Sequence, residues 1–213
     1  MSERYARQSG ILDPEKLRQT SVAVIGCGAV GRQTALQLAS SGQRNLNLYD
    51  HDIIEEVNLG PQAWPAGALG WSKVEQLTEQ IRADYPDAEP IPHRQRCPLT
   101  GVTADVLFFC VDSIETRRRL WEAYKDRVIF DARVAGEIIR LISVTDEEQR
   151  VHYPDTLFSS GEAMQASCTT RMTVFSANIA AGLLMEQYSK WLRGLPLDRD
   201  TLINLLAMVM IQK

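Results

Sequence analysis

The segment from Gly26 to Gly31, which reads G-C-G-A-V-G, places the tightest constraint on how this chain folds. It follows the short apolar run Ser21–Ile25, which fits a buried parallel strand. Apolar residues then recur at helical spacing over Ala29–Ser41, and a second strand is predicted at Leu46–Tyr49. A G-x-G-x-x-G turn between a strand and a helix brings free backbone N–H groups to a helix N-terminus, where phosphate binds. The sequence therefore predicts a Rossmann-type βαβ unit that holds a nucleotide.

Strand and helix patterns keep alternating along the rest of the chain, which favours a mostly parallel sheet. Further strands are expected at Val106–Val111, Val128–Ala132 and Glu137–Thr145, and helices at Ser72–Tyr85, Glu115–Tyr124 and Met172–Leu192. Residues 51–69 and 146–170 are expected to be irregular, and Thr201–Ile211 fits either a strand or a helix. We therefore predict an α/β fold in one domain over residues 1–213. It has a mostly parallel central sheet, flanking helices, and a C-terminal β portion plus a long helix.

Charge and hydropathy exclude several classes of partner. The formal net charge is −4 and no Lys/Arg-rich block is present, so no nucleic-acid partner is expected. No run of about 18 apolar residues exists, so no membrane partner is expected either. The first five residues lack the apolar core of a signal peptide, and we expect a cytoplasmic protein.

Asp50 ends the second predicted strand, 19 residues after Gly31. An acidic residue at this point accepts hydrogen bonds from the ribose hydroxyls of a bound nucleotide. Taken alone, the loop and Asp50 favour an NAD-dependent oxidoreductase, and a glycine turn that serves only packing is the simpler alternative.

Other groups of residues point to a different class of enzyme. In chain order they are Arg4-Tyr5-Ala6-Arg7-Gln8, Asp50-His51-Asp52, Asn58-Leu59 with Gln62, Gly70 with Lys73, and Cys110-Val111-Asp112 with Thr116-Arg117. This ordered set resembles the ThiF/MoeB/HesA family, which includes the catalytic core of ubiquitin-activating enzymes. The resemblance runs from about Arg4 to Gly194, nearly the whole chain, and implies that residues 1–213 form a single ThiF-type nucleotide-binding domain.

The resemblance implies a reaction. Members of the family use ATP and Mg²⁺ to adenylate the C-terminal glycine of a ubiquitin-like or sulfur-carrier protein that ends in Gly-Gly. Negative charge gathers around phosphorus in such a reaction, so the site needs cations. An adenylating enzyme that acts on a tRNA base or a peptide is an alternative, and no basic patch favours the tRNA substrate.

The resemblance also implies residue roles. Lys73 contacts phosphate, Asp112 binds Mg²⁺ through hard oxygen ligands, and Arg7 reaches the site of a second copy across the interface of a homodimer. The implied cofactor-binding set is Gly26, Gly28, Gly31, Asp50, Asp52, Asn58, Gln62 and Lys73, and the catalytic set is Arg7, Lys73, Asp112 and Cys168.

Several of these residues have a simpler interpretation. Lys73 and Arg7 are then solvated surface charges, Asp112 is the N-cap of the following helix, and Asn58 is a turn residue.

Two features mark the chain as a divergent, zinc-less member of the family. The family motif N-L-x-R-Q reads Asn58-Leu59-Gly60-Pro61-Gln62 here, so Pro61 replaces a phosphate-binding arginine. Arg32 or Lys73 compensates for it, or the chemistry is altered, or the protein is a catalytically impaired nucleotide-binding scaffold. None of the four cysteines (Cys27, Cys97, Cys110, Cys168) forms a C-x-x-C pair, so no structural zinc is expected.

Cys168 precedes the long predicted helix and lies close to Arg171. Thioester- and persulfide-forming relatives have a reactive cysteine at a similar point, and a helix N-terminus with a nearby cation favours a thiolate. Cys168 is therefore a candidate acceptor for the acyl group or sulfur, and the alternative is a small residue that only packs at the helix start.

Overall fold

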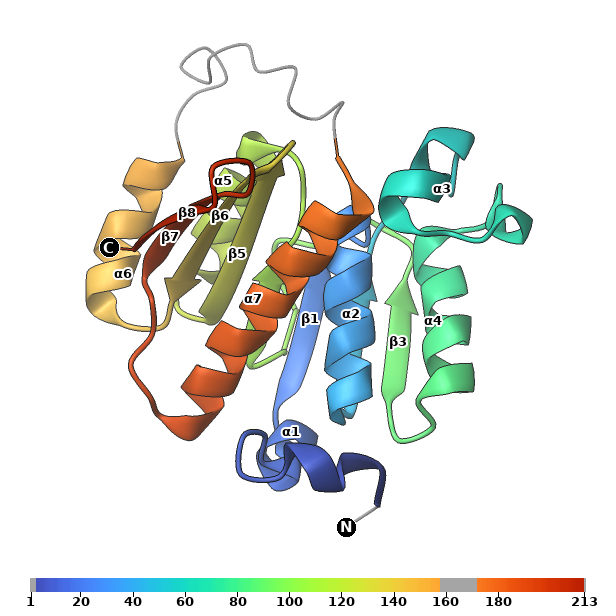
Figure 1. Ribbon diagram of the computed structural model, residues 1–213, viewed down its shortest axis with the longest axis horizontal. Helices are drawn as coiled ribbons and strands as arrows, with labels where there is room; N and C mark the ends of the chain where they lie inside the picture. Colours follow the sequence, from blue (N-terminus) through green and yellow to red (C-terminus); the bar gives the residue numbers. More distant parts are fainter. Residues whose placement is uncertain (1–2, 158–171, 213) are drawn as a thin grey trace.

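The computed structural model describes residues 3–157 and 172–212. Over these residues, eight strands form one sheet in the order β3-β2-β1-β4-β5-β6-β7-β8 (Figure 1). The strands are β1 Ser21–Ile25, β2 Asn45–Tyr49, β3 Glu89–His93, β4 Val106–Phe109, β5 Val128–Ala135, β6 Ile138–Val144, β7 Asp200–Asn204 and β8 Val209–Gln212. The pairs from β3 to β5 are parallel, and β5 to β8 pair antiparallel. The predicted α/β fold with a C-terminal β portion is confirmed.

Helices cover both faces of this sheet. They are η1 Glu3–Gln8, α1 Pro14–Gln19, α2 Ala29–Ser41, α3 Glu56–Gln62, η2 Ala66–Ala68, α4 Lys73–Asp84, α5 Ile114–Tyr124, α6 Glu147–His152, η3 Tyr153–Thr156 and α7 Val174–Arg193. Alternate residues along a strand point to opposite faces. Val24 and Phe108 accordingly pack in the core under α2, α4 and α7, whereas Ile25 and Leu107 pack in the core under α5 and η3.

The predicted helix Ala29–Ser41 is confirmed at both ends, because its boundaries are encoded locally. Gly28 is the N-cap of α2, and Gly42 ends the helix with a φ of 99°. The Gly42 N–H donates to the carbonyls of Leu38 and Ala39, a helix stop that favours glycine.

Two segments expected to be irregular contain helices. Within residues 51–69, α3 forms because the Glu55 and Asn58 side chains make a capping box, and it ends at Ala63 in the left-handed region. Within 146–157, Asp146 caps α6 by accepting a hydrogen bond from the Gln149 N–H. The expectation for 51–69 was wrong because Asn, Gly and Pro were taken to exclude a helix, and the expectation for 146–157 was wrong because a polar segment was taken for a loop.

The C-terminal segment that fitted a strand or a helix forms the hairpin β7–β8. At the other edge of the sheet, β3 contains Pro90 and Pro92 and, among the described strands, pairs with β2 alone; an edge strand of this kind tolerates proline.

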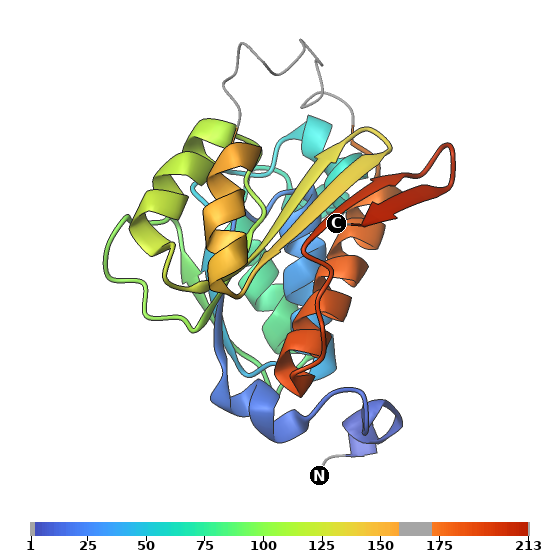
Figure 2. The same cartoon turned by 90° about the vertical axis from the view of Figure 1, so that its left-hand side faces the viewer.

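The parallel strands define two ends of the molecule (Figure 2). The carboxyl ends of β1, β2, β4 and β5 lie at the end where the glycine loop begins α2, and η1 and α1 lie at the opposite end. In open α/β sheets, ligands bind at the carboxyl ends of the strands. No helix among the described residues is long and apolar enough to cross a membrane.

Candidate nucleotide site

The three loop glycines have different surroundings. A Cβ on Gly31 would lie 1.7 Å from the carbonyl oxygen of Gly26. Gly26 has a φ of +89°, and a Cβ there would lie 2.8 Å from the carbonyl oxygen of Cys110. A Cβ on Gly28 would meet nothing within 4 Å. The first and third glycines therefore let the turn close, while the second leaves the backbone at the start of α2 open to a ligand.

Asp50 joins this loop to the end of β2. Its side chain is buried, and one carboxylate oxygen accepts from the Cys27 N–H at 2.7 Å. The other oxygen accepts from the Asp52 N–H at 2.9 Å. Each carboxylate oxygen has a second lone pair, so Asp50 can hold the loop and still accept from a ribose hydroxyl.

Lys73 is the first residue of α4, and its side chain is buried. Its ammonium donates to the Asp52 carboxylate at 2.8 Å, and its N–H donates to the Asp52 carbonyl at 3.1 Å. Burial alone would raise the pKa of the Asp52 carboxyl, but the hydrogen bond and charge of Lys73 outweigh it, so this pKa lies below its ordinary value. The burial of Lys73 does not match the alternative of a solvated surface lysine.

Asp112 is exposed just beyond the end of β4. β4 is adjacent to β1 in the sheet, with Ile25 opposite Phe109, so Asp112 lies at the same edge as the glycine loop. Ser113, not Asp112, caps α5 by accepting from the Thr116 N–H at 3.2 Å, so the N-cap interpretation of Asp112 is wrong. An exposed carboxylate at this edge fits Mg²⁺, which prefers oxygen ligands and retains several waters.

Acidic residues gather next to the loop. Candidate ligand atoms of Asp50, His51 and Asp52 all lie within 4.8 Å of one another. The donor set at this edge is thus made mainly of carboxylates, which suits a hard cation.

Asn58 and Gln62 both make local contacts. The Asn58 side chain accepts from the Glu55 N–H at 3.0 Å in the capping box of α3. The Gln62 side chain accepts from the Trp64 indole N–H at 2.9 Å. The interpretation of Asn58 as a turn residue is therefore wrong, because it lies in the first turn of α3, where its side-chain oxygen caps the helix start. Its side-chain amide N–H₂ makes no hydrogen bond within the described residues.

Arg7 lies at the other end of its own chain's α2. η1 is held there because the Tyr5 hydroxyl donates to Asp87 at 3.0 Å and the Gln8 amide donates to the Ser41 carbonyl at 2.6 Å. A helix of 13 residues is about 20 Å long, so Arg7 and the glycine loop are well separated within one chain. Cys168 lies outside the described residues.

A buried ionic cluster beneath this edge was not singled out from the sequence. Asp131 on β5 is fully buried and accepts from the guanidinium groups of Arg117 and Arg133, each at 2.8 Å, and from the Tyr153 hydroxyl at 2.9 Å. Burial alone would raise the pKa of the Asp131 carboxyl, but the two guanidinium groups outweigh it and lower the pKa. The available signal was two charged residues, Asp131 and Arg133, in an otherwise apolar strand pattern.

The doubly wound sheet defines an α/β domain of the Rossmann type, and the open glycine loop, Asp50 and the Lys73–Asp52 pair form its candidate nucleotide site. The sequence profile of the ThiF family matches residues 3–209, and the chain belongs to this family.

Related proteins agree with this assignment. The chain is 34% identical over 125 residues to "Adenylyltransferase and sulfurtransferase uba4" of Aspergillus terreus, a match that covers 54% of this chain and 26% of the relative. It is 34% identical over 127 residues to "Adenylyltransferase and sulfurtransferase MOCS3" of Sus scrofa, covering 54% and 28%. The chain thus matches about a quarter of the length of these relatives.

Solved structures show the same fold. E. coli MccB in complex with ATP superposes with a TM-score of 0.78 at 17% identity, covering 100% of this chain and 71% of MccB. PaaA superposes with a TM-score of 0.78 at 20% identity, covering 99% and 72%.

Proposed function

We propose that residues 1–213 form one nucleotide-binding domain that uses ATP to adenylate the C-terminal carboxylate of a ubiquitin-like or sulfur-carrier protein ending in Gly-Gly. A carboxylate oxygen of the carrier attacks the α-phosphorus of ATP. The bond from that phosphorus to the bridging oxygen breaks, so pyrophosphate leaves and an acyl-adenylate remains. The curated relatives named above are adenylyltransferases, which supports this class of reaction.

The ion pair between buried Lys73 and half-exposed Asp52, near the open Gly28 backbone, carries the proposal. A site for hydride transfer has no need of a buried lysine at this edge, whereas transfer of an adenylyl group develops negative charge that a fixed cation stabilises. This observation favours adenylation over an NAD-dependent oxidoreductase.

Each remaining residue has a role in the proposal. Asp50 accepts from the ribose, the backbone from Gly26 to Gly31 receives phosphate, and Lys73 holds a phosphate oxygen. Asp112 holds Mg²⁺, which when bound neutralises charge between the phosphates. Asn58 and Gln62 line the phosphates with the polar atoms that their local bonds leave free.

Three further elements extend the proposal. Arg7 acts on the site of a second copy, so the protein is a homodimer. Cys168 acts after adenylation: its thiolate attacks the acyl carbon of the adenylate, so that a thioester forms and AMP leaves. In the sulfur-carrying version its thiolate instead attacks the outer sulfur of a donor persulfide, and the donor leaves as a thiolate. The reaction takes place in the cytoplasm.

The experiment that tests adenylation is ATP–pyrophosphate exchange, measured with candidate carrier proteins ending in Gly-Gly. Wild-type protein should exchange label only with a carrier present, and Asp112→Ala should slow exchange by about 100-fold or more because a metal ligand is lost. The matched control is Asp126→Ala, which removes an exposed aspartate just before β5, at the opposite end of the sheet.

Other outcomes count against adenylation. ATP binding without exchange, for any carrier or peptide carboxylate, contradicts the proposal and favours a nucleotide-binding scaffold, the alternative that Pro61 raises. Exchange that Asp112→Ala leaves intact contradicts the role of Asp112.

A further inference from the structure

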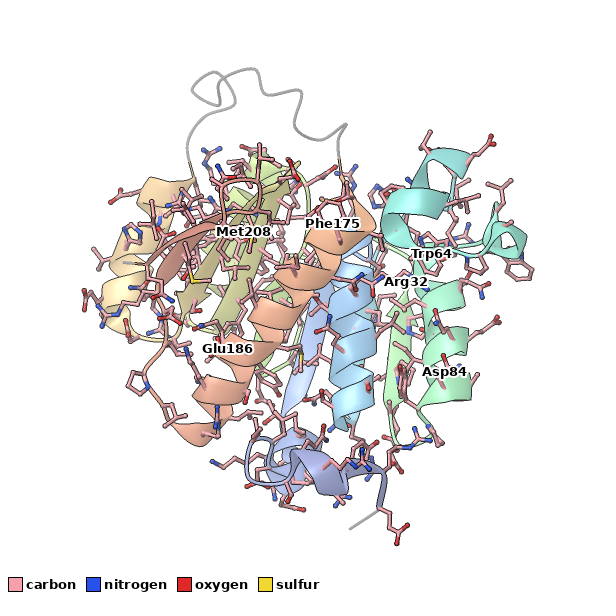
Figure 3. All side chains as sticks on the ribbon, viewed as in Figure 1. Arg32, Trp64, Asp84, Phe175, Glu186 and Met208 are labelled. Atoms are coloured by element: carbon pink, nitrogen blue, oxygen red, sulfur yellow. The ribbon has the colours of Figure 1, made fainter. Side chains whose placement is uncertain are left out.

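Arg32 is a buried cation on the first turns of α2, close to the glycine loop in sequence. Its side chain is only 5% exposed. One terminal guanidinium nitrogen donates to the Gln80 side-chain oxygen at 2.7 Å, and the guanidinium lies over Trp64, 4.3 Å from the ring centre (Figure 3). Gln80 on α4 and the Trp64 ring therefore fix the position of the Arg32 guanidinium.

Arg32 has no anionic partner within the described residues. Its Nε is buried and makes no hydrogen bond there, and its recorded polar contact is the neutral amide of Gln80. Arg117, which is also buried, pairs with Asp131 instead. A buried charge that lacks a counterion is costly, and burial lowers the pKa of Arg32. The arrangement is that of a cation prepared for an anion from outside the chain.

There is room for such an anion. Arg32 and Trp64 line a cavity of about 720 Å³ that runs along one side of α4; its lining does not include the glycine loop, Asp50, Lys73 or Asp112, so only Arg32 and the first turns of α2 connect it to that site. Gln76 and Gln80 add amide groups to its wall. Its carboxylates are Glu79, which is exposed, and Asp84, at the last residue of α4; neither pairs with Arg32.

We propose that Arg32 binds the phosphate oxygens of ATP that leave as pyrophosphate, with Trp64 and Gln80 as positioning residues; this rests on the proposed function. Arg32 lies one helical turn beyond Gly28 on the helix whose N-terminus faces the phosphates. A guanidinium binds a phosphate through two parallel hydrogen bonds, a geometry that lysine lacks. Pro61, three residues before Trp64, has no charge to offer, and Arg32 supplies the missing cation from a neighbouring element.

The test measures binding calorimetrically, with ATP, AMP and inorganic tripolyphosphate as separate ligands in the presence of Mg²⁺. Arg32→Gln should lower the affinity for ATP and for tripolyphosphate about 10- to 100-fold. It should change the affinity for AMP by less than about threefold, because AMP lacks the phosphates that Arg32 contacts. Arg32→Lys keeps the charge and should lose less affinity than Arg32→Gln. Arg44→Gln is the matched control, since Arg44 is exposed and pairs with Glu89 beside the amino ends of β2 and β3.

A loss of AMP affinity as large as that of ATP, or unchanged ATP affinity in Arg32→Gln, would overturn the assignment. If Arg32→Gln does not fold, the affinities of Arg32→Lys for the same three ligands provide the test, and unchanged ATP affinity or an equal loss for AMP would again overturn the assignment. Selective loss of ATP affinity in a protein that never exchanges pyrophosphate supports Arg32 as a phosphate ligand and contradicts adenylation. Carrier-dependent exchange together with unchanged ATP affinity in Arg32→Gln supports adenylation and contradicts Arg32 as a phosphate ligand.

Discussion

The glycines of the loop show how much one motif depends on individual residues. Gly26 and Gly31 approach backbone oxygens too closely for any side chain, whereas Gly28 faces open space. Glycine therefore permits close packing at Gly26 and Gly31 and leaves space for a ligand at Gly28.

This difference predicts two separable phenotypes. Gly31→Ala should destabilise the fold by about 3 kcal/mol, because its Cβ would overlap the Gly26 carbonyl oxygen and the backbone would have to move. Gly28→Ala should cost under about 1 kcal/mol, because its φ of −73° suits alanine, yet it should weaken ATP binding. Urea unfolding and ATP titration on both variants provide the measurements. Equal stability losses in the two variants would contradict the assignment of roles.

At the scale of elements, Asp131 joins three parts of the chain that are far apart in sequence. It lies on β5, Arg117 comes from α5, and Tyr153 comes from η3. Arg133 extends the cluster to the carbonyl of Thr156 at 2.7 Å, close to Leu157, where this described part of the chain ends. The cluster thus positions the carboxyl end of β5 against the helices on one face of the sheet.

Asp131→Asn should therefore destabilise the protein by about 3–5 kcal/mol at neutral pH, because two guanidinium groups lose a buried counterion. The pKa of Asp131 is lowered in the folded state, so its stabilisation is fully present above the unfolded pKa of about 3.9 and is lost as pH falls through the folded pKa. The stability difference between wild type and Asp131→Asn should hold constant down to about pH 5 and shrink below about pH 4. Urea unfolding across this pH range measures the stability difference. A difference that grows in acid would contradict a lowered pKa of Asp131.

For the whole molecule, the separation of the two ends of α2 governs how a complete site is formed. The glycine loop lies at one end, and η1 with Arg7 is fixed at the other by Tyr5 and Gln8. A site that uses both must take Arg7 from a second copy, as the proposed homodimer does.

Such a shared site predicts complementation between inactive variants. Arg7→Ala and Lys73→Gln should each lose exchange activity alone. Their mixture should recover about a quarter of wild-type activity, because half of the randomly formed dimers contain one intact site of two. Pyrophosphate exchange measures the recovery, and sedimentation velocity measures the dimer. A monomer, or a mixture no more active than its components, contradicts a site shared between copies.

Local patterns in the sequence were sufficient for the first βαβ unit and the expected nucleotide end of the sheet. Ala29–Ser41 was predicted to the residue because its caps and apolar spacing are short-range features. The helix α3 was missed because Asn58 reads as a turn residue until its side chain is seen in a capping box.

Pairings between residues that are distant in sequence depend on the tertiary structure. The burial of Lys73 against Asp52, the cluster around Asp131 and the surroundings of Arg32, which has no counterion in the described part of the chain, depend on segments that meet only after folding. The sequence lists the charged groups, but the energy of a charge depends on what surrounds it, and burial and partners are set by the assembled sheet and helices.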